Sequence, residues 1–155
     1  MHEPGTSTRS RNMRAIGRRN TKPELIVRRH LHAHGLRFRV DVGGLPGRPD
    51  VVLRKWSTTI MVHGCFWHRH PGCRYAYTPG SNVEFWESKF GRNVERDVRN
   101  LADLRGAGWR VAVIWECALR PTTRDCALAD LVSWITSGSN VVYSSDRVAP
   151  PISHV

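Results

Sequence analysis

The stretch from His63 to Cys73 constrains the fold of this chain more than any other feature. Its eleven residues include two cysteines, three histidines and the adjacent aromatic pair Phe66 and Trp67. Cys and His are the side chains that bind zinc and related transition metals. The stretch directly follows an apolar run over residues 58–62. We therefore expect a buried strand that delivers its end to a metal-bound loop.

Side chains from two parts of the chain are candidates for one metal site. Cys65, His70 and Cys73 lie close together, and Cys117 ends a later apolar run. If the two runs are neighbouring strands, Cys117 completes a tetrahedral Cys-His-Cys-Cys site, an arrangement typical of structural zinc. The alternative is that Cys117 and Cys126 are small buried apolar side chains and that His70 is exposed. Clustering favours zinc for the three cysteines of the proposed site, whereas the alternative is preferred for Cys126, which lies on an apolar helical stretch.

The distribution of charge points to a nucleic-acid partner. The chain has 155 residues, with 24 Lys and Arg against 13 Asp and Glu, and residues 1–39 hold ten of the basic residues and only two acidic ones. Basic side chains that neutralise phosphates release counterions, which favours binding to nucleic acid. The alternative is a basic arm that is merely solvated.

The sequence also indicates the cellular compartment in which the protein resides. The N-terminus carries polar and charged residues where a signal peptide needs an apolar core, and no apolar run reaches the length of a membrane span. We expect a cytoplasmic, nucleoid-associated protein without membrane contact. Its cysteines should then be thiols or metal ligands and not disulfides.

Hydrophobic periodicity predicts an α/β fold, with a central mixed β-sheet flanked by helices. The first helix is expected from Lys22 to His34, with capping by the Thr21 hydroxyl and Glu24, and an end at Gly35. The other expected elements are strands 37–42, 50–53, 58–62 and 109–116, a helical region over 81–105 with a capping box at 81–84 and a break near Gly91, and a helix over 125–136.

These elements should form one domain. Strand 109–116 is apolar on both faces, which predicts a central place in the sheet, and the helical region 81–105 can connect two parallel strands. We expect residues 1–12 to be a flexible basic arm, residues 13–137 to be the domain and residues 138–155 to be a mobile tail.

Asp50 is a candidate ligand for a hard cation. It follows Pro49 at the start of a predicted strand, which is the first half of the PD-(D/E)xK nuclease pattern. The second half is absent, because Val62, His63 and Gly64 stand where an acidic residue and a lysine are expected. A lone Pro-Asp is usually turn chemistry. As a functional group, Asp50 would hold Mg²⁺.

His68 and Asp97 could supply the missing acid–base chemistry. On a helix, Asp97 shares a face with Phe90, Leu101 and Leu104, which places a carboxylate among core residues. A buried carboxylate needs a partner. If Asp97 binds one nitrogen of His68, the other nitrogen can deprotonate water. The alternative is an Asp that is solvated or paired for structure alone.

The aromatic residues divide into two groups. Trp109, Trp115 and Trp134 fall on strand or helix faces and are expected in the core. Phe66, Trp67 and Trp86 fit the core less well, because Phe66 and Trp67 alternate with metal ligands and a candidate base. Aromatic side chains beside a basic surface can wedge between bases.

Together these residues closely resemble the very short patch repair (Vsr) family of DNA mismatch endonucleases. The resemblance covers roughly residues 6–135. The matching runs are Thr8 to Ile16, Leu45 to Asp50, His63 to His68, Asn93 to Asp97, Gly108 to Val111 and Trp115 to Cys117.

The resemblance implies a type II restriction endonuclease-like fold of the PD-(D/E)xK superfamily with a structural zinc loop. It implies an enzyme that nicks one strand 5′ to the T of a T:G mismatch left by deamination of 5-methylcytosine. Asp50 and the Val62 carbonyl would bind Mg²⁺, and Glu24 would order metal-bound water. His68 with Asp97 would serve the attacking water, and His63 would lie near the scissile phosphate.

The resemblance also implies how DNA is held. Phe66, Trp67 and Trp86 would intercalate from the major groove, while Met13, Arg14 and Ile16 would approach from the minor groove. We also expect Lys89 and Asn93 to contact DNA. The protein is expected to act as a monomer, with mismatch-repair proteins as candidate partners. Two alternatives stay open: a zinc-stabilised DNA-binding module without catalysis, and a nicking endonuclease with relaxed specificity.

Overall fold

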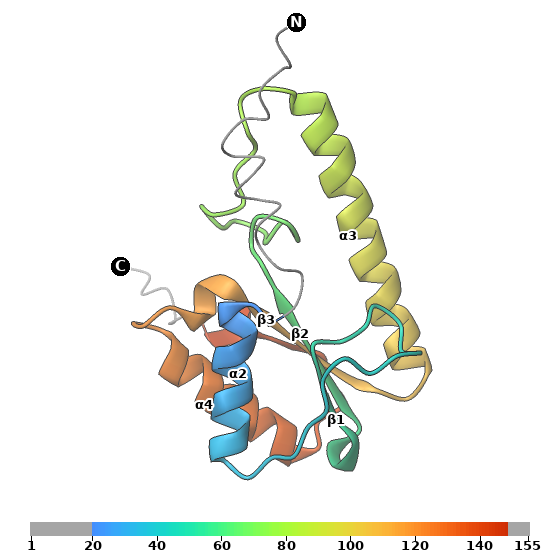
Figure 1. Ribbon diagram of the computed structural model, residues 1–155, viewed down its shortest axis with the longest axis vertical. Helices are drawn as coiled ribbons and strands as arrows, with labels where there is room; N and C mark the ends of the chain where they lie inside the picture. Colours follow the sequence, from blue (N-terminus) through green and yellow to red (C-terminus); the bar gives the residue numbers. More distant parts are fainter. Residues whose placement is uncertain (1–19, 149–155) are drawn as a thin grey trace, which may run out of the picture.

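A four-stranded sheet organises the protein in the computed structural model, which describes residues 20–148 (Figure 1). Its strands lie side by side in chain order. The first pair is antiparallel and the next two pairs are parallel, so the predicted mixed sheet is confirmed. The strands are β1 (Val51–Leu53), β2 (Thr58–His63), β3 (Arg110–Trp115) and β4 (Tyr143–Ser144).

In the part of the chain that the structure describes, three α-helices cover the sheet (Figure 1). Helices α2 (Lys22–Ala33) and α4 (Arg124–Ser137) lie together on one side, and the long helix α3 (Val83–Gly106) stands on the other. Within residues 20–148, no helix is both long enough and apolar enough to cross a membrane.

Strand β3 separates two apolar cores, which explains why both of its faces are apolar. Ala112 and Ile114 pack into the core beneath α2 and α4. Val111 and Val113 belong to a second core that includes Leu104 of α3. The predicted central position of this strand is therefore confirmed.

The parallel pair β2 and β3 positions the functional loops. Its register runs from Thr58 opposite Arg110 to His63 opposite Trp115, and α3 lies in the connection between the two strands, as predicted. Because parallel strands end at the same edge of a sheet, the loop after His63 and the short helix η2 (Glu116–Leu119) begin side by side.

Two local predictions were wrong. Residues 37–42 form a single antiparallel bridge between Arg39 and Val52 in place of a strand, and the backbone turns at Asp41, whose φ is 56°. Helix α3 continues through Gly91 without a break. A glycine costs a helix only about 1 kcal/mol relative to alanine, which the packed residues on either side can offset.

The predicted helix caps form differently from the expected pattern. Neither Thr21 nor Asn82, the cap residues of α2 and α3, makes a side-chain capping bond. Glu24 does reach back, and its carboxylate accepts the Asn20 N–H at 3.0 Å. The carboxylate half of the first capping box therefore forms, one residue earlier than expected.

Residues 143–148 belong to the fold, which corrects the prediction of a mobile tail after Gly138. Strand β4 adds to the open edge of β3, and the Tyr143 side chain is buried. The short helix η3 (Ser145–Val148) follows, and the Ser145 hydroxyl accepts the Trp115 N–H at 3.0 Å. The buried Arg110 side chain holds the preceding turn, because its Nε donates to the Ser139 carbonyl at 2.7 Å.

Candidate functional site

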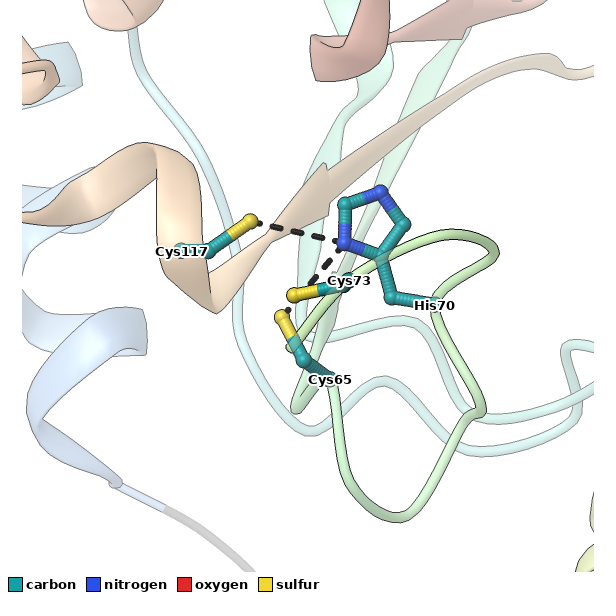
Figure 2. Close-up of side chains that lie close together, drawn as sticks. All are labelled: Cys65, His70, Cys73 and Cys117. Atoms are coloured by element: carbon teal, nitrogen blue, oxygen red, sulfur yellow. Dashed lines mark hydrogen bonds between the residues drawn. The ribbon is translucent and has the colours of Figure 1, made fainter. Parts of the chain in front are cut away.

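The predicted metal ligands meet at the edge where β2 and β3 end. Cys65, His70 and Cys73 come from the loop after β2, and Cys117 comes from η2 (Figure 2). Their candidate ligand atoms all lie within 4.8 Å of one another. His70 Nδ1 is 3.6 Å from the Cys65 sulfur and 3.4 Å from the Cys117 sulfur. The structure therefore brings together the four side chains that the sequence singled out.

The donor set fits a tetrahedral metal ion. Three sulfurs and one imidazole nitrogen are the ligands of structural zinc sites. Burial raises the pKa of the Cys65 and Cys117 thiols above the usual value. Thiol ligands must be deprotonated to bind, so a cation would have to offset this desolvation. Cys126 is exposed on α4, which corrects its expected burial.

A second cluster joins the end of β2 to α3. His68 Nδ1 lies 2.6 Å from Asp97 Oδ2, so the predicted contact is confirmed. His63 stacks on His68 with ring centroids 3.9 Å apart and an angle of 3° between the planes. The Asp97 carboxylate fixes the His68 tautomer with its proton on Nδ1, which leaves a lone pair on Nε2.

The parallel rings indicate that His63 and His68 do not share a metal ion. A metal bound to an imidazole nitrogen lies in the plane of that ring, and two parallel stacked planes do not meet. Burial, followed by the charge of His68, lowers the pKa of His63 to about 4. His63 is therefore neutral at neutral pH and supports the His68 ring by stacking.

Asp50 lies just before β1, beside β2. One carboxylate oxygen accepts the Val62 N–H at 2.7 Å. Burial raises the pKa of Asp50 to about 6, against the lowering effect of that hydrogen bond. The Asp50 N–H donates to the Ile60 carbonyl, so alternate β2 residues direct their backbone groups toward Asp50. The Val62 carbonyl therefore faces the same side as the carboxylate.

Glu24 and Arg28 of α2 flank Asp50. The Glu24 carboxylate is buried and binds the Arg28 guanidinium at 3.1 Å. The charge of Glu24 raises the pKa of Asp50 and that of Arg28 lowers it. Sequence reasoning missed Arg28, although its spacing of four residues from Glu24 is that of a helical ion pair.

The raised pKa of Asp50 predicts that Asp50→Asn makes the metal-free protein more stable above pH 6. The folded-state pKa is near 6 and the ordinary value is 3.8. The folded state therefore binds the proton more tightly, and stability falls as pH rises between these values. Asparagine carries no charge at any pH, so its advantage should reach up to about 3 kcal/mol at pH 8. Urea unfolding of both proteins at pH 4 and pH 8 measures it. An advantage that is equal at both pH values would contradict this account.

An aromatic cluster surrounds the predicted wedge residues. The Phe66 centroid lies 5.0 Å from that of Trp67 and 5.8 Å from that of Trp86. The Lys89 ammonium is 5.0 Å from the Trp67 ring centroid. Asn93 donates to the Trp67 carbonyl at 3.1 Å. The three aromatic side chains are half-buried, so the rings support one another where we expected no core packing.

The chain is similar to known DNA mismatch endonucleases. A family model described as "DNA mismatch endonuclease Vsr" matches residues 2–74. The DNA mismatch endonuclease Vsr of Escherichia coli is 47% identical over 132 residues, which are 83% of this chain and 84% of that protein. The chain belongs to the Vsr family of DNA mismatch endonucleases.

Other proteins similar to this chain are named as type II nicking enzymes. The type II nicking enzyme V.NmeAIP of Neisseria meningitidis is 43% identical over 115 residues, covering 74% of this chain and 81% of that protein. The type II nicking enzyme V.XorIIP of Xanthomonas oryzae pv. oryzae is 46% identical over 107 residues, covering 69% of this chain and 78% of that protein. The family predicted from the motifs is therefore confirmed.

Some of the Vsr-family site lies outside the described residues. Met13, Arg14 and Ile16, expected to approach DNA, fall in the part of the chain before residue 20. Of the predicted residues that are described, the structure gathers the metal ligands, the His63, His68 and Asp97 cluster, the Asp50 environment and the aromatic cluster. Two exposed aromatic side chains, Phe85 and Tyr77, were missed. The Phe85 ring centroid lies 5.4 Å from that of Trp86, and the Tyr77 centroid lies 5.1 Å from that of Phe66.

Proposed function

We propose that this protein is a DNA nicking endonuclease of mismatch repair. It cuts one strand of duplex DNA 5′ to the T of a T:G mismatch left by deamination of 5-methylcytosine. The observation that carries this proposal is the His68–Asp97 contact at 2.6 Å beside His63. A DNA-binding module has no need of a histidine whose tautomer is fixed for accepting a proton.

The reaction is hydrolysis of a phosphodiester bond. His68 Nε2 accepts a proton from the attacking water, and the Asp97 carboxylate stabilises the imidazolium that forms. His63 keeps the His68 ring in place and faces the scissile phosphate. The negative charge that develops on the phosphate needs a positive partner, and the His68 imidazolium is already paired with the Asp97 carboxylate.

Asp50 and the Val62 carbonyl are the proposed ligands of Mg²⁺. A hard cation that keeps several waters prefers carboxylate and carbonyl oxygens. When bound, Mg²⁺ neutralises charge on the phosphate. Glu24, held by Arg28, lies close enough to raise the pKa of Asp50, which supports its proposed role in ordering water beside that carboxylate.

Zinc is the proposed ion of the Cys65, His70, Cys73 and Cys117 site. The loop that holds three of these ligands also carries Phe66, Trp67 and His68. A zinc ion that fixes this loop would therefore orient the proposed base, His68, together with the proposed wedge residues Phe66 and Trp67. This arrangement, with Asp50 beside a mixed sheet, supports the proposed type II restriction endonuclease-like architecture of the PD-(D/E)xK superfamily.

The aromatic cluster is the proposed wedge at the mismatch. Phe66, Trp67 and Trp86 enter between bases from the major groove, and Lys89 and Asn93 are proposed to contact DNA nearby. A mismatched pair costs less to unstack than a matched pair, which favours entry at that step. Met13, Arg14 and Ile16 are proposed to approach the opposite groove.

Strand-resolved nicking across a mismatch panel tests this function. End-labelled duplexes that differ only at one position, with T:G, T:A, C:G or another mismatch, are incubated with the protein and Mg²⁺. We expect one cut, in the T strand of the T:G duplex, that is lost when EDTA is added. Equal cutting of all mismatches would indicate relaxed specificity, and tight binding without cutting would favour the non-catalytic module.

A further inference from the structure

The metal-ligating histidine has a second partner outside the ligand set. His70 directs Nδ1 toward the cysteine sulfurs, while Nε2 contacts the Asp146 carboxylate of η3. We propose that Asp146 is a positioning residue for the metal, which sets the tautomer and orientation of His70. This inference rests on the proposed metal site but not on the proposed reaction.

The surroundings of the two His70 ring nitrogens determine which of them carries the proton. A neutral imidazole carries one proton, and the nitrogen that binds a metal must be the unprotonated one. Nδ1 faces the sulfurs, so the proton must be on Nε2. Asp146 accepts it there, which fixes the ring with Nδ1 toward the sulfurs.

The residues around Asp146 hold this contact in place. The Ser144 hydroxyl donates to the other carboxylate oxygen at 3.2 Å. Trp115 stacks on the His70 ring with centroids 4.3 Å apart and an interplanar angle of 12°, and the backbone N–H of Trp115 donates to the Ser145 hydroxyl. Asp146 of η3 therefore supports the edge of the imidazole, while Trp115 of β3 covers its face.

The contact gives the C-terminal segment a part in the site. His70 is buried, whereas the Asp146 side chain is 52% exposed. A carboxylate in contact with water contributes less than a buried one, so we expect an effect near the lower end of the 10–100-fold range for such partners. Trp115 also meets the His63 ring edge-on, with centroids 5.2 Å apart.

Zinc competition on the full-length protein tests the proposal. The zinc-loaded wild type, Asp146→Ala, Asp146→Asn and Ser144→Ala are titrated with a chromophoric chelator. The control is Asp103→Ala, which removes an exposed acidic residue from α3. We expect Asp146→Ala to raise the zinc dissociation constant about tenfold. The zinc dissociation constant of Asp146→Asn should fall between those of the wild type and Asp146→Ala, because the asparagine carbonyl can accept the same hydrogen bond without a charge. The dissociation constant of Asp103→Ala should match that of the wild type.

A spectroscopic measurement separates positioning from loss of fold. Cobalt(II) in place of zinc reports ligand geometry through its visible absorption, and circular dichroism reports folding. The proposal requires that Asp146→Ala change the cobalt spectrum while the protein stays folded. Equal zinc affinity in wild type and Asp146→Ala, or an equal loss in Asp103→Ala, would overturn it. A wild type that releases zinc as readily as Cys117→Ser would overturn the metal site and this inference together.

Discussion

Replacing His68 by alanine is expected to lower the rate of nicking by about 10²–10⁴-fold, the usual contribution of a general base. The ring contacts Asp97 and His63 and is not one of the proposed wedge residues, so affinity for the T:G duplex should change little. Single-turnover cleavage and a binding titration on the same duplex measure the two quantities separately. A parallel loss of binding and cleavage would mean that His68 holds DNA and does not activate water.

Asp97→Asn should lower the rate by a similar factor, because an amide neither stabilises an imidazolium nor enforces the same tautomer. If the two residues act as one unit, the double variant should be no slower than the slower single variant. Asp103→Asn on the same helix is the control, since Asp103 is exposed. Losses that multiply in the double variant would assign the two residues separate roles.

Cys117→Ser should remove the bound zinc and destabilise the protein. Cys117 is the only one of the four ligands that lies outside the loop after β2, so it ties that loop to η2 and β3. Loss of a structural metal belongs to the most costly class of substitution. A cost of about 3 kcal/mol would lower Tm by roughly 10 °C in a chain of this size.

Cys126→Ser is the matched control for this experiment. Cys126 is an exposed cysteine on α4, so the same chemical change there should leave zinc content and Tm at the wild-type values. Metal analysis and thermal unfolding measure both effects. If Cys117→Ser retained zinc in wild-type amount, the ligand set would be wrong.

The parts of the site that follow from local spacing could be predicted from the sequence. The metal ligands of the loop are close in the chain, and Cys117 joins them because β2 and β3 are parallel and in register at His63 and Trp115. Asp97 was found from helical periodicity, since α3 places it one turn before Leu101 toward the sheet. In each case one regular element fixes the position of the residue.

The parts that depend on irregular contacts could not be predicted. Strand β4 has only two residues, too few for a periodic pattern, and it forms because the edge of β3 is open. No sequence pattern therefore indicated a role for Asp146. The surroundings of Asp50 could not be derived from spacing, because Glu24 and Arg28 come from a helix distant in sequence. The family resemblance pointed to Glu24, whereas nothing pointed to Arg28.

Cutting by the wild type and Asp50→Ala on one T:G duplex, with a T:A duplex of the same sequence as control, tests the central claim most directly. The labelled T strand is resolved on a denaturing gel after incubation with Mg²⁺, and binding of each protein is measured in parallel. The wild type should make one cut 5′ to the mismatched T and leave the T:A duplex intact. Asp50→Ala should bind the T:G duplex without cutting it. Cutting that survives Asp50→Ala, or a wild type that binds the mismatch and never cuts, would contradict the account.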